Sequence, residues 1–138
     1  MLFRSFQISE GVANIIHKSS NDFEKALKEK HKIGMWYPRG YNEMHMLTAA
    51  INKAKSFEPK AIAAALEGMD FDVFNGGPGT MRKDDHQFFQ PIYISSFGER
   101  NDKEPFDEES TGWGWRIVAT VDTKDTSLPT TCKRARPS

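Results

Sequence analysis

Two helical segments in immediate succession, within residues 34–66, constrain the fold more than any other part of the sequence. Apolar residues recur three or four positions apart over residues 41–54, so they share one face of an α-helix. Pro59 suits the first turn of a second helix, because an N–H at that position needs no partner, and an alanine-rich run follows it. Gly68 marks the end of this helix. We therefore predict a helix pair that ends near residue 67, with strands before and after it.

The segments ahead of the helix pair carry weaker patterns. Residues 2–8 alternate apolar and polar side chains, which is typical of a β-strand, and residues 11–16 form a short apolar run that indicates a strand or the end of a loop. Asn21 and Glu24 have the spacing of a capping box, with Asn21 as the cap of a charged helix that runs to about residue 32. Phe23, Ala26 and Leu27 form the narrow apolar face of that helix, so we expect it to dock by one edge.

The segments after the helix pair have the character of β-structure. We predict extended segments at residues 71–74 and 80–82, a tight turn at residues 75–79 and a polar turn at residues 83–86. Residues 88–94 are rich in β-formers, although Pro91 removes one ladder donor and indicates an edge or crossover strand. An acidic loop at 98–112 leads to a last strand at 113–121, and together they predict a long-looped hairpin. Along that last strand, residues 113, 115, 117, 119 and 121 are expected on one side, and residues 122–138 form a tail without periodicity.

Charge and cysteine content exclude several classes of function. The 19 basic residues balance the 19 acidic ones, so no global field attracts nucleic acid or an anionic membrane. The single cysteine, Cys132, excludes an internal disulfide and a cysteine-built zinc site. No run of residues approaches the length of a membrane span, and residues 1–6 lack the long apolar core of a signal peptide. We expect any export signal to lie outside this chain.

The sequence offers little that would support catalysis. Asp84, Asp85 and His86 are adjacent, and such groups can bind a divalent metal or act as acid and base, but neighbouring residues rarely converge on one ion, so we favour a solvated turn. The glycine-rich residues 76–79 lack the lysine and the following helix of a phosphate-binding loop, and Cys132 lies in the tail. We therefore expect neither an enzyme nor a cofactor or metal site.

An aromatic cluster precedes the first helix of the pair. Trp36, Tyr37 and Tyr41 surround the cation Arg39, and this combination suits a small amphipathic ligand such as an amino acid. The alternative is that Trp36 and Tyr41 are anchors of the hydrophobic core, which is the more frequent role of apolar residues ahead of a helix. On the residues alone, the alternative is favoured.

An ordered series of segments resembles one known family. The series comprises residues 34–41, 49–54, 58–66, 74–82, 84–87 and 90–94. It is similar to the C-terminal third of the type I periplasmic solute-binding proteins of the Leu/Ile/Val-binding class, which deliver substrates to ABC transporters. The resemblance covers roughly residue 21 to the end and rests on the order of the segments, since no single motif is diagnostic.

The resemblance implies a fold and a function. It implies an α/β chain that is a fragment of a two-lobed fold, with helices on a mixed sheet and a C-terminal β-hairpin. Residues 1–121 would form part of one lobe with a hinge crossover near 88–94, and residues 122–138 an irregular tail. Trp36 matches a position where family members place an aromatic side chain against the ligand, and Tyr37 and Tyr41 complete the predicted ligand-binding residues.

The function implied is non-catalytic binding of a branched-chain amino acid or a similar small solute in the periplasm, for delivery to a membrane permease. Because family members are more than twice as long and hold most of their ligand contacts elsewhere, we expect this chain to be a fragment. Two alternatives remain open. One is a ligand-sensing domain of the same fold that serves regulation, and the other is a stand-alone α/β interaction domain.

Overall fold

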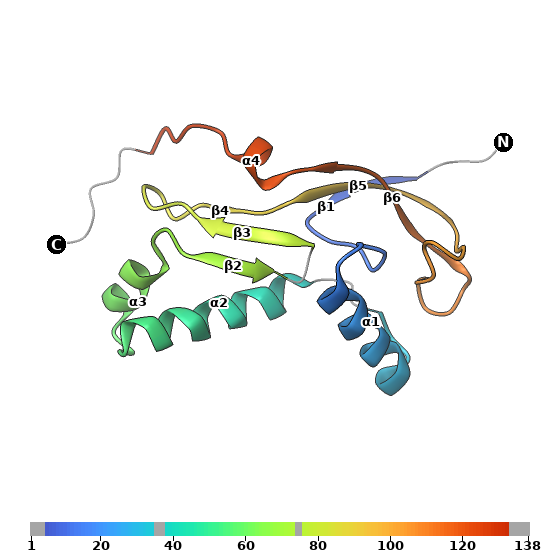
Figure 1. Cartoon of the computed structure of the whole chain (residues 1–138), viewed down its shortest axis with the longest axis horizontal. Helices are drawn as coiled ribbons and strands as arrows, with labels where there is room; N and C mark the ends of the chain where they lie inside the picture. Colours follow the sequence, from blue (N-terminus) through green and yellow to red (C-terminus); the bar gives the residue numbers. More distant parts are fainter. Residues whose placement is uncertain (1–4, 35–37, 74–75, 133–138) are drawn as a thin grey trace.

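The computed structural model describes residues 5–34, 38–73 and 76–132, which form two antiparallel sheets and the helices beside them (Figure 1). The strands are β1 (Phe6–Ser9), β2 (Asp70–Val73), β3 (Gly77–Met81), β4 (Phe88–Phe89), β5 (Ile92–Glu99) and β6 (Trp113–Val121). The helices are α1 (Lys18–His31), α2 (Pro38–Ala54), α3 (Pro59–Leu66) and α4 (Thr123–Thr126). Within the described residues, no helix is both long and apolar enough to cross a membrane.

The first sheet has the strand order β1–β5–β6. The predicted hairpin of β5 and β6 is confirmed, but the prediction that one side of β6 runs unbroken from residue 113 to residue 121 is wrong. Ser95 lies opposite Ile117 and Ile94 lies opposite Ala119, so Val118 is an extra residue in the ladder. Such a bulge shifts the alternation by one residue. Trp113, Trp115 and Ile117 therefore share one face, and Ala119 and Val121 lie on the other.

The covered face of this sheet holds a small hydrophobic core. Val12, Ile15 and Tyr93 are buried there, with Trp115 and Ile117 packed against them. The predicted apolar run at 11–16 is thus a loop that covers the sheet. The opposite face is open, since Phe6 and Ile8 of β1 are 61% and 74% exposed.

The second sheet has the strand order β2–β3–β4, and Figure 1 shows α2 and α3 on one side of it. Both predicted helices of the pair are confirmed, with α2 beginning three residues earlier than its apolar pattern. The predicted turn at residues 75–79 is too long, because Gly77 already pairs with Val73 and Gly79 with Phe71. A side chain at Gly79 would meet the Phe88 ring, since a Cβ there would lie 2.1 Å from it.

Pro91 separates two strands that belong to different sheets. β4 pairs with β3, and β5 pairs with β1 and β6, so the chain passes from one sheet to the other at residues 90–91. The segment predicted as one β-rich unit, 88–94, is therefore two strands with the proline at the crossing. Each strand pair in the described residues is antiparallel, so this part of the fold contributes no parallel pair to the mixed sheet that we expected.

Helix α1 differs from its prediction at the N-terminus. Asn21 is not the cap, because its N–H already donates to the His17 carbonyl at 3.0 Å and the cap is His17. The Ser19 and Ser20 hydroxyls approach His17 Nδ1 at 3.0 and 3.2 Å, which gives the first turn polar partners that the sequence pattern did not reveal. The buried residues of α1 are Ser20 and Glu24, not the predicted apolar face.

The chain after β6 is less irregular than predicted. Residues 123–126 form the short helix α4, and the Thr123 and Thr126 hydroxyls donate to the carbonyls of Pro78 and Gln90 at 2.9 and 3.4 Å. The start of the predicted tail is thus fastened to both β3 and the crossing segment.

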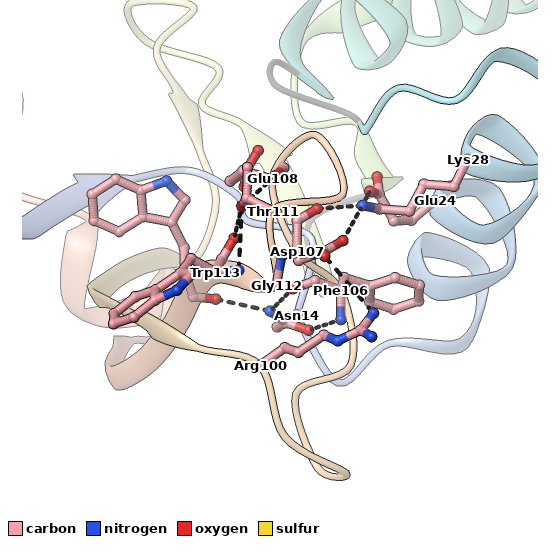
Figure 2. Close-up of polar contacts among 11 residues, drawn as sticks. Asn14, Glu24, Lys28, Arg100, Phe106, Asp107, Glu108, Thr111, Gly112 and Trp113 are labelled. Atoms are coloured by element: carbon pink, nitrogen blue, oxygen red, sulfur yellow. Dashed lines mark hydrogen bonds and ion pairs between the residues drawn. The ribbon is translucent and has the colours of Figure 1, made fainter.

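Asn14 fastens the acidic loop of the hairpin to the rest of the molecule (Figure 2). Its side-chain amide donates to the carbonyls of Phe106 and Trp115 at 2.9 and 3.0 Å, and its oxygen accepts the Phe106 N–H at 3.0 Å. The side chain is almost fully buried, with Asn14 7% exposed. Asn14 thereby provides hydrogen-bond partners for backbone groups of a loop that is not part of a β-sheet.

Asp107 forms the second anchor of the loop (Figure 2). Its carboxylate accepts the Gly112 N–H at 2.8 Å and pairs with Lys28 of α1 at 3.1 Å and with Arg100 at 3.7 Å. Burial alone would raise the pKa of Asp107, but the Gly112 N–H and the two cations outweigh it, so the pKa lies below its ordinary value. The loop is therefore tied to a helix by a charge and to itself by a backbone bond.

Removing the Asn14 side chain should weaken the whole hairpin. Asn14→Ala leaves buried carbonyls and one N–H without partners, so we expect a loss of about 1–3 kcal/mol in the free energy of unfolding. Urea denaturation followed by circular dichroism measures this. Ile16→Ala, two residues away at a side chain that is 93% exposed, should change little, and equal losses in both variants would contradict the role of Asn14.

The Asp107 anchor should make stability depend on pH in the acid range. A carboxyl whose pKa is lowered in the folded state contributes stability that is present above its unfolded pKa, about 4, and is lost as pH falls through the folded pKa. Asp107→Asn should therefore be less stable than the unsubstituted chain at pH 7, by about 1–3 kcal/mol, and this difference should shrink on acidification. Urea denaturation of both chains at pH 7 and in the acid range measures it. A difference independent of pH would mean that the charge is not the cause.

Candidate functional site

A groove runs from β1 across the first residues of α2 to the acidic loop, and we call it the Arg39 groove. Its volume is about 320 Å³, and its lining comprises Gln7, Ile8, Ser9, Glu10, Gly11, Val12, Ala13, Pro38, Arg39, Glu108 and Trp115. These residues come from four separate parts of the chain, which the fold brings together. The volume lies in the range of small-molecule sites in proteins.

An ion pair crosses the Arg39 groove. Arg39 Nε and Nη2 both donate to Glu10 Oε1, at 2.9 and 2.6 Å. The Glu10 side chain is mostly covered whereas the Arg39 side chain is mostly exposed. The pair places one positive and one negative group in the same small space, which Trp115 also lines.

Glu108 adds a second carboxylate to the groove. Burial raises the pKa of Glu108, and the nearby negative charge of Glu24 raises it further, although Lys28 opposes this. Glu24 is itself 1% exposed and lies 3.9 Å from Lys28. The loop end of the groove is therefore a place where negative charge is concentrated and partly desolvated.

A second, larger groove lies between the loop before α1, strands β5 and β6, and the acidic loop. It measures about 860 Å³ and its floor includes Ile15, Tyr93 and Ile117, with loop residues 101–104 at its rim. Gly76, with φ +87°, lies against it, and a Cβ there would approach the Tyr93 hydroxyl to 2.3 Å. This groove is mainly apolar, and Tyr41, the predicted ligand residue that the structure describes, is not among its lining residues.

Of the three predicted ligand residues, the structure describes Tyr41. Trp36 and Tyr37 lie outside the described residues. Tyr41 lies on α2 with its ring 5.0 Å from that of Phe23 and 4.4 Å from that of His45, and it lines none of the grooves described here. Arg39, the cation of the predicted cluster, does line a groove, so the fold brings this part of the cluster to a concave surface.

Sequence reasoning did not single out Glu10 or Glu108 as site residues. Glu10 follows a short strand and Glu108 lies among many acidic residues, so neither stands in a motif. The relevant signal in the sequence is the acidic loop at residues 98–112, which is longer than a simple hairpin needs.

The polar turn at 83–86 is confirmed as a turn. Arg82 Nε and Nη2 donate to the two Asp85 oxygens at 2.8 and 2.5 Å, and these bonds hold the pKa of Asp85 well below its ordinary range. His86 lies 3.3 Å from Glu67. In the described part of the chain no three His, Cys, Asp or Glu side chains gather in a way that would hold a metal ion.

Comparison with known proteins identifies the fold. The family model described as periplasmic binding protein matches residues 13–102, which is more than half of the chain. Comparison with curated proteins finds no match.

Several solved structures share the fold at low sequence identity. The leucine-, isoleucine-, valine-, threonine- and alanine-binding protein of Brucella ovis superposes with a TM-score of 0.78 at 18% identity, over 96% of this chain and 35% of its own. An ABC-type branched-chain amino acid transporter of Rhodopseudomonas palustris CGA009 superposes with a TM-score of 0.72 at 21% identity, over 94% of this chain and 33% of its own. A solute-binding protein of an ABC transporter from Rhodopseudomonas palustris BisB5, solved in complex with 3,4-dihydroxybenzoic acid, superposes with a TM-score of 0.70 at 19% sequence identity. The match covers 86% of this chain and 31% of that protein.

The chain spans about a third of the length of these structures. The expected α/β fold, as part of a type I periplasmic-binding-protein fold, is thereby confirmed. On the match over residues 13–102, the chain belongs to the periplasmic binding protein family.

Proposed function

We propose that the chain is the part of an ABC-transporter substrate-binding protein that contributes one wall of a site for a branched-chain amino acid or a similar small solute. The observation that carries this proposal is the family match over residues 13–102. The solved relatives named for branched-chain amino acids support the solute class.

The Arg39 groove supports the same proposal on chemical grounds. An amino acid carries a carboxylate, an ammonium group and a side chain, and the lining of the groove includes Arg39, the carboxylates Glu10 and Glu108, and Trp115. Planar guanidinium groups suit carboxylate recognition, because they present paired donors. Pro38 lines the groove and directly follows the predicted ligand residues Trp36 and Tyr37 in the sequence. We propose Trp36 as an apolar wall, with Tyr37 and Tyr41 as its aromatic neighbours.

The proposed mechanism is trapping of the solute by closure of two lobes about a hinge, followed by docking of the closed form on a membrane permease in the periplasm. We assign residues 1–121 to part of one lobe and the hinge crossover to residues 88–94. Pro91 supports this assignment, because it stands where the chain passes from one sheet to the other. In this scheme residues 122–138 follow the lobe as its C-terminal tail, and α4 attaches the first part of that tail to β3.

Calorimetric titration of the chain with L-leucine, L-isoleucine and L-valine tests the proposal. We expect saturable binding, and we expect Trp36→Ala and Arg39→Ala each to raise the dissociation constant about 10-fold or more, because each removes one contact worth roughly 1.5–3 kcal/mol. D-glucose serves as the control solute and should give no heat of binding.

A matched control variant removes a cation that does not line the Arg39 groove. Arg100→Ala removes a cation that pairs with Asp107 rather than Glu10, so it should leave the affinity for these amino acids unchanged. Absence of binding by all three amino acids, or unchanged affinity in both Trp36→Ala and Arg39→Ala, would refute the proposed site.

A further inference from the structure

After β4 the chain passes between the two sheets twice. At residues 90–91 it leaves the second sheet for the first, because β4 pairs with β3 whereas β5 pairs with β1 and β6. At the end of β6 it turns back, and residues 123–130 contact β3 and the polar turn that follows it. We call residues 123–130 the strap. In Figure 1 the strap runs along the second sheet, on the opposite side from α2 and α3.

Two threonine hydroxyls fasten the near end of the strap, which is α4. The Thr123 hydroxyl donates to the Pro78 carbonyl of β3 at 2.9 Å. The Thr126 hydroxyl is shared between the Gln90 carbonyl at 3.4 Å and the Thr123 carbonyl at 2.8 Å. The acceptors are backbone groups of the second sheet and of the crossing itself. The near end of the strap is therefore attached beside the point where the chain crosses between the sheets.

An ion pair of the second sheet holds the far end of the strap. The Arg82 guanidinium donates to the Leu128 carbonyl and lies over the Phe89 ring, with Cζ 4.6 Å from the ring centroid. Asp85, which binds Arg82 through both carboxylate oxygens, also accepts a hydrogen bond from the Thr130 hydroxyl. A guanidinium bound at two oxygens is fixed in orientation, so it offers the strap a rigid attachment.

Two side-chain contacts elsewhere also connect the segments around the two sheets. Arg39 of α2 pairs with Glu10 at 2.6 Å, and the His17 ring lies 3.6 Å from the Asp72 carboxylate of β2. One partner of each contact, Arg39 or Asp72, is mostly exposed. Exposed charged pairs contribute little stability and are screened by salt. The threonine bonds of the strap join uncharged groups, so screening does not weaken them in this way.

We infer that the strap restrains movement of the two sheets relative to each other about the crossing at residues 90–91. A body joined by one short segment can turn about it, whereas a second attachment beside that segment limits the turn. The family match ends at residue 102, before the strap begins. This restraint goes beyond the proposed function, because it concerns two parts of this chain and requires no solute.

Double electron–electron resonance between two spin labels tests the restraint without any solute. Asn52→Cys on α2 and Glu99→Cys on β5 place one label beside each sheet, at positions that are exposed. Each labelled chain also carries Cys132→Ser, because Cys132 is an exposed thiol that would react with the label. With the strap intact, we expect one narrow distribution of distances between the labels.

The variant that releases the strap combines Thr123→Val and Thr126→Val. Both substitutions keep the branched shape of the side chain and remove the hydroxyl that donates to the second sheet or to the crossing. We expect the distribution of label distances to widen and to gain a second population. Circular dichroism should show that the variant has the same helix and strand content as the unsubstituted chain.

Amide hydrogen exchange gives a second measure of the release. The N–H groups of Asp125 and Thr126 donate to the Asp122 carbonyl within α4, at 2.8 and 3.2 Å. In the double variant we expect these amides to exchange at least about 5-fold faster, the factor by which one hydrogen bond of ordinary net strength changes an opening equilibrium. The amides between β5 and β6 should exchange at an unchanged rate, which distinguishes release of the strap from global unfolding.

Thr120→Val is the matched control. Thr120 is exposed on β6, and within the described part of the chain its hydroxyl makes no hydrogen bond, so both measurements should stay unchanged. Raising the NaCl concentration from about 50 to about 500 mM screens the exposed charged pairs and should leave the distribution narrow while the strap is intact. Unchanged distances in the double variant, equal widening in Thr120→Val, or widening caused by salt would each refute the restraint by the strap.

Failure of the strap and failure of the proposed function are distinguishable, because the label distances are measured without solute. If no amino acid binds but the double variant widens the distribution, the proposed function fails and the strap stands. If amino acids bind and the double variant leaves the distribution unchanged, the proposed function stands and the strap is refuted.

Discussion

The hydrogen bonds of one buried amide hold together the half of the structure that contains the first sheet. Asn14 bonds in both directions to Phe106 and also reaches the Trp115 carbonyl, so one side chain connects the loop over the sheet, the acidic loop and β6. An aspartate there would accept but not donate, and an apolar residue would do neither. The walls of the Arg39 groove lie on these same segments, so the shape of the groove depends on this amide.

The acidic loop places two neighbouring carboxylates in different surroundings. Asp107 faces α1 and is neutralised by Lys28 and Arg100, whereas Glu108 lines the groove and has no bonded cation among the described residues. Asp107 therefore attaches the loop to α1, whereas the next residue, Glu108, lines the groove.

The parts of the fold that sequence could predict are those set by local chemistry. The helix pair follows from spacing of apolar residues, Pro59 and Gly68, and the hairpin follows from its turn-rich acidic centre. The bulge at Val118 could not be predicted, because it is imposed by the partner strand and leaves no mark in an apolar run. The start of α1 was misplaced for a similar reason, since the contacts between His17 and two serines compete with an equally good capping pattern at Asn21.

The candidate site was less predictable than the fold. Arg39 could be found because it stands beside aromatic residues, but Glu10 becomes a site residue only when β1 lies beside the start of α2. Tyr41 illustrates the limit of a cluster drawn from sequence alone. It lies two residues after Arg39 on α2, so it is on another face of the helix, where its ring packs against Phe23 and not in the groove that contains Arg39.

The open side of β1 has a consequence for how the chain behaves in solution. Phe6 and Ile8 are exposed, and the four residues of the strand include neither lysine nor proline, the residues by which proteins commonly protect the edge of a sheet. Antiparallel pairing leaves every second residue of an edge strand with outward N–H and C=O groups. We therefore expect this chain by itself to aggregate through this edge as its concentration rises. Low protein concentration should favour the monomer.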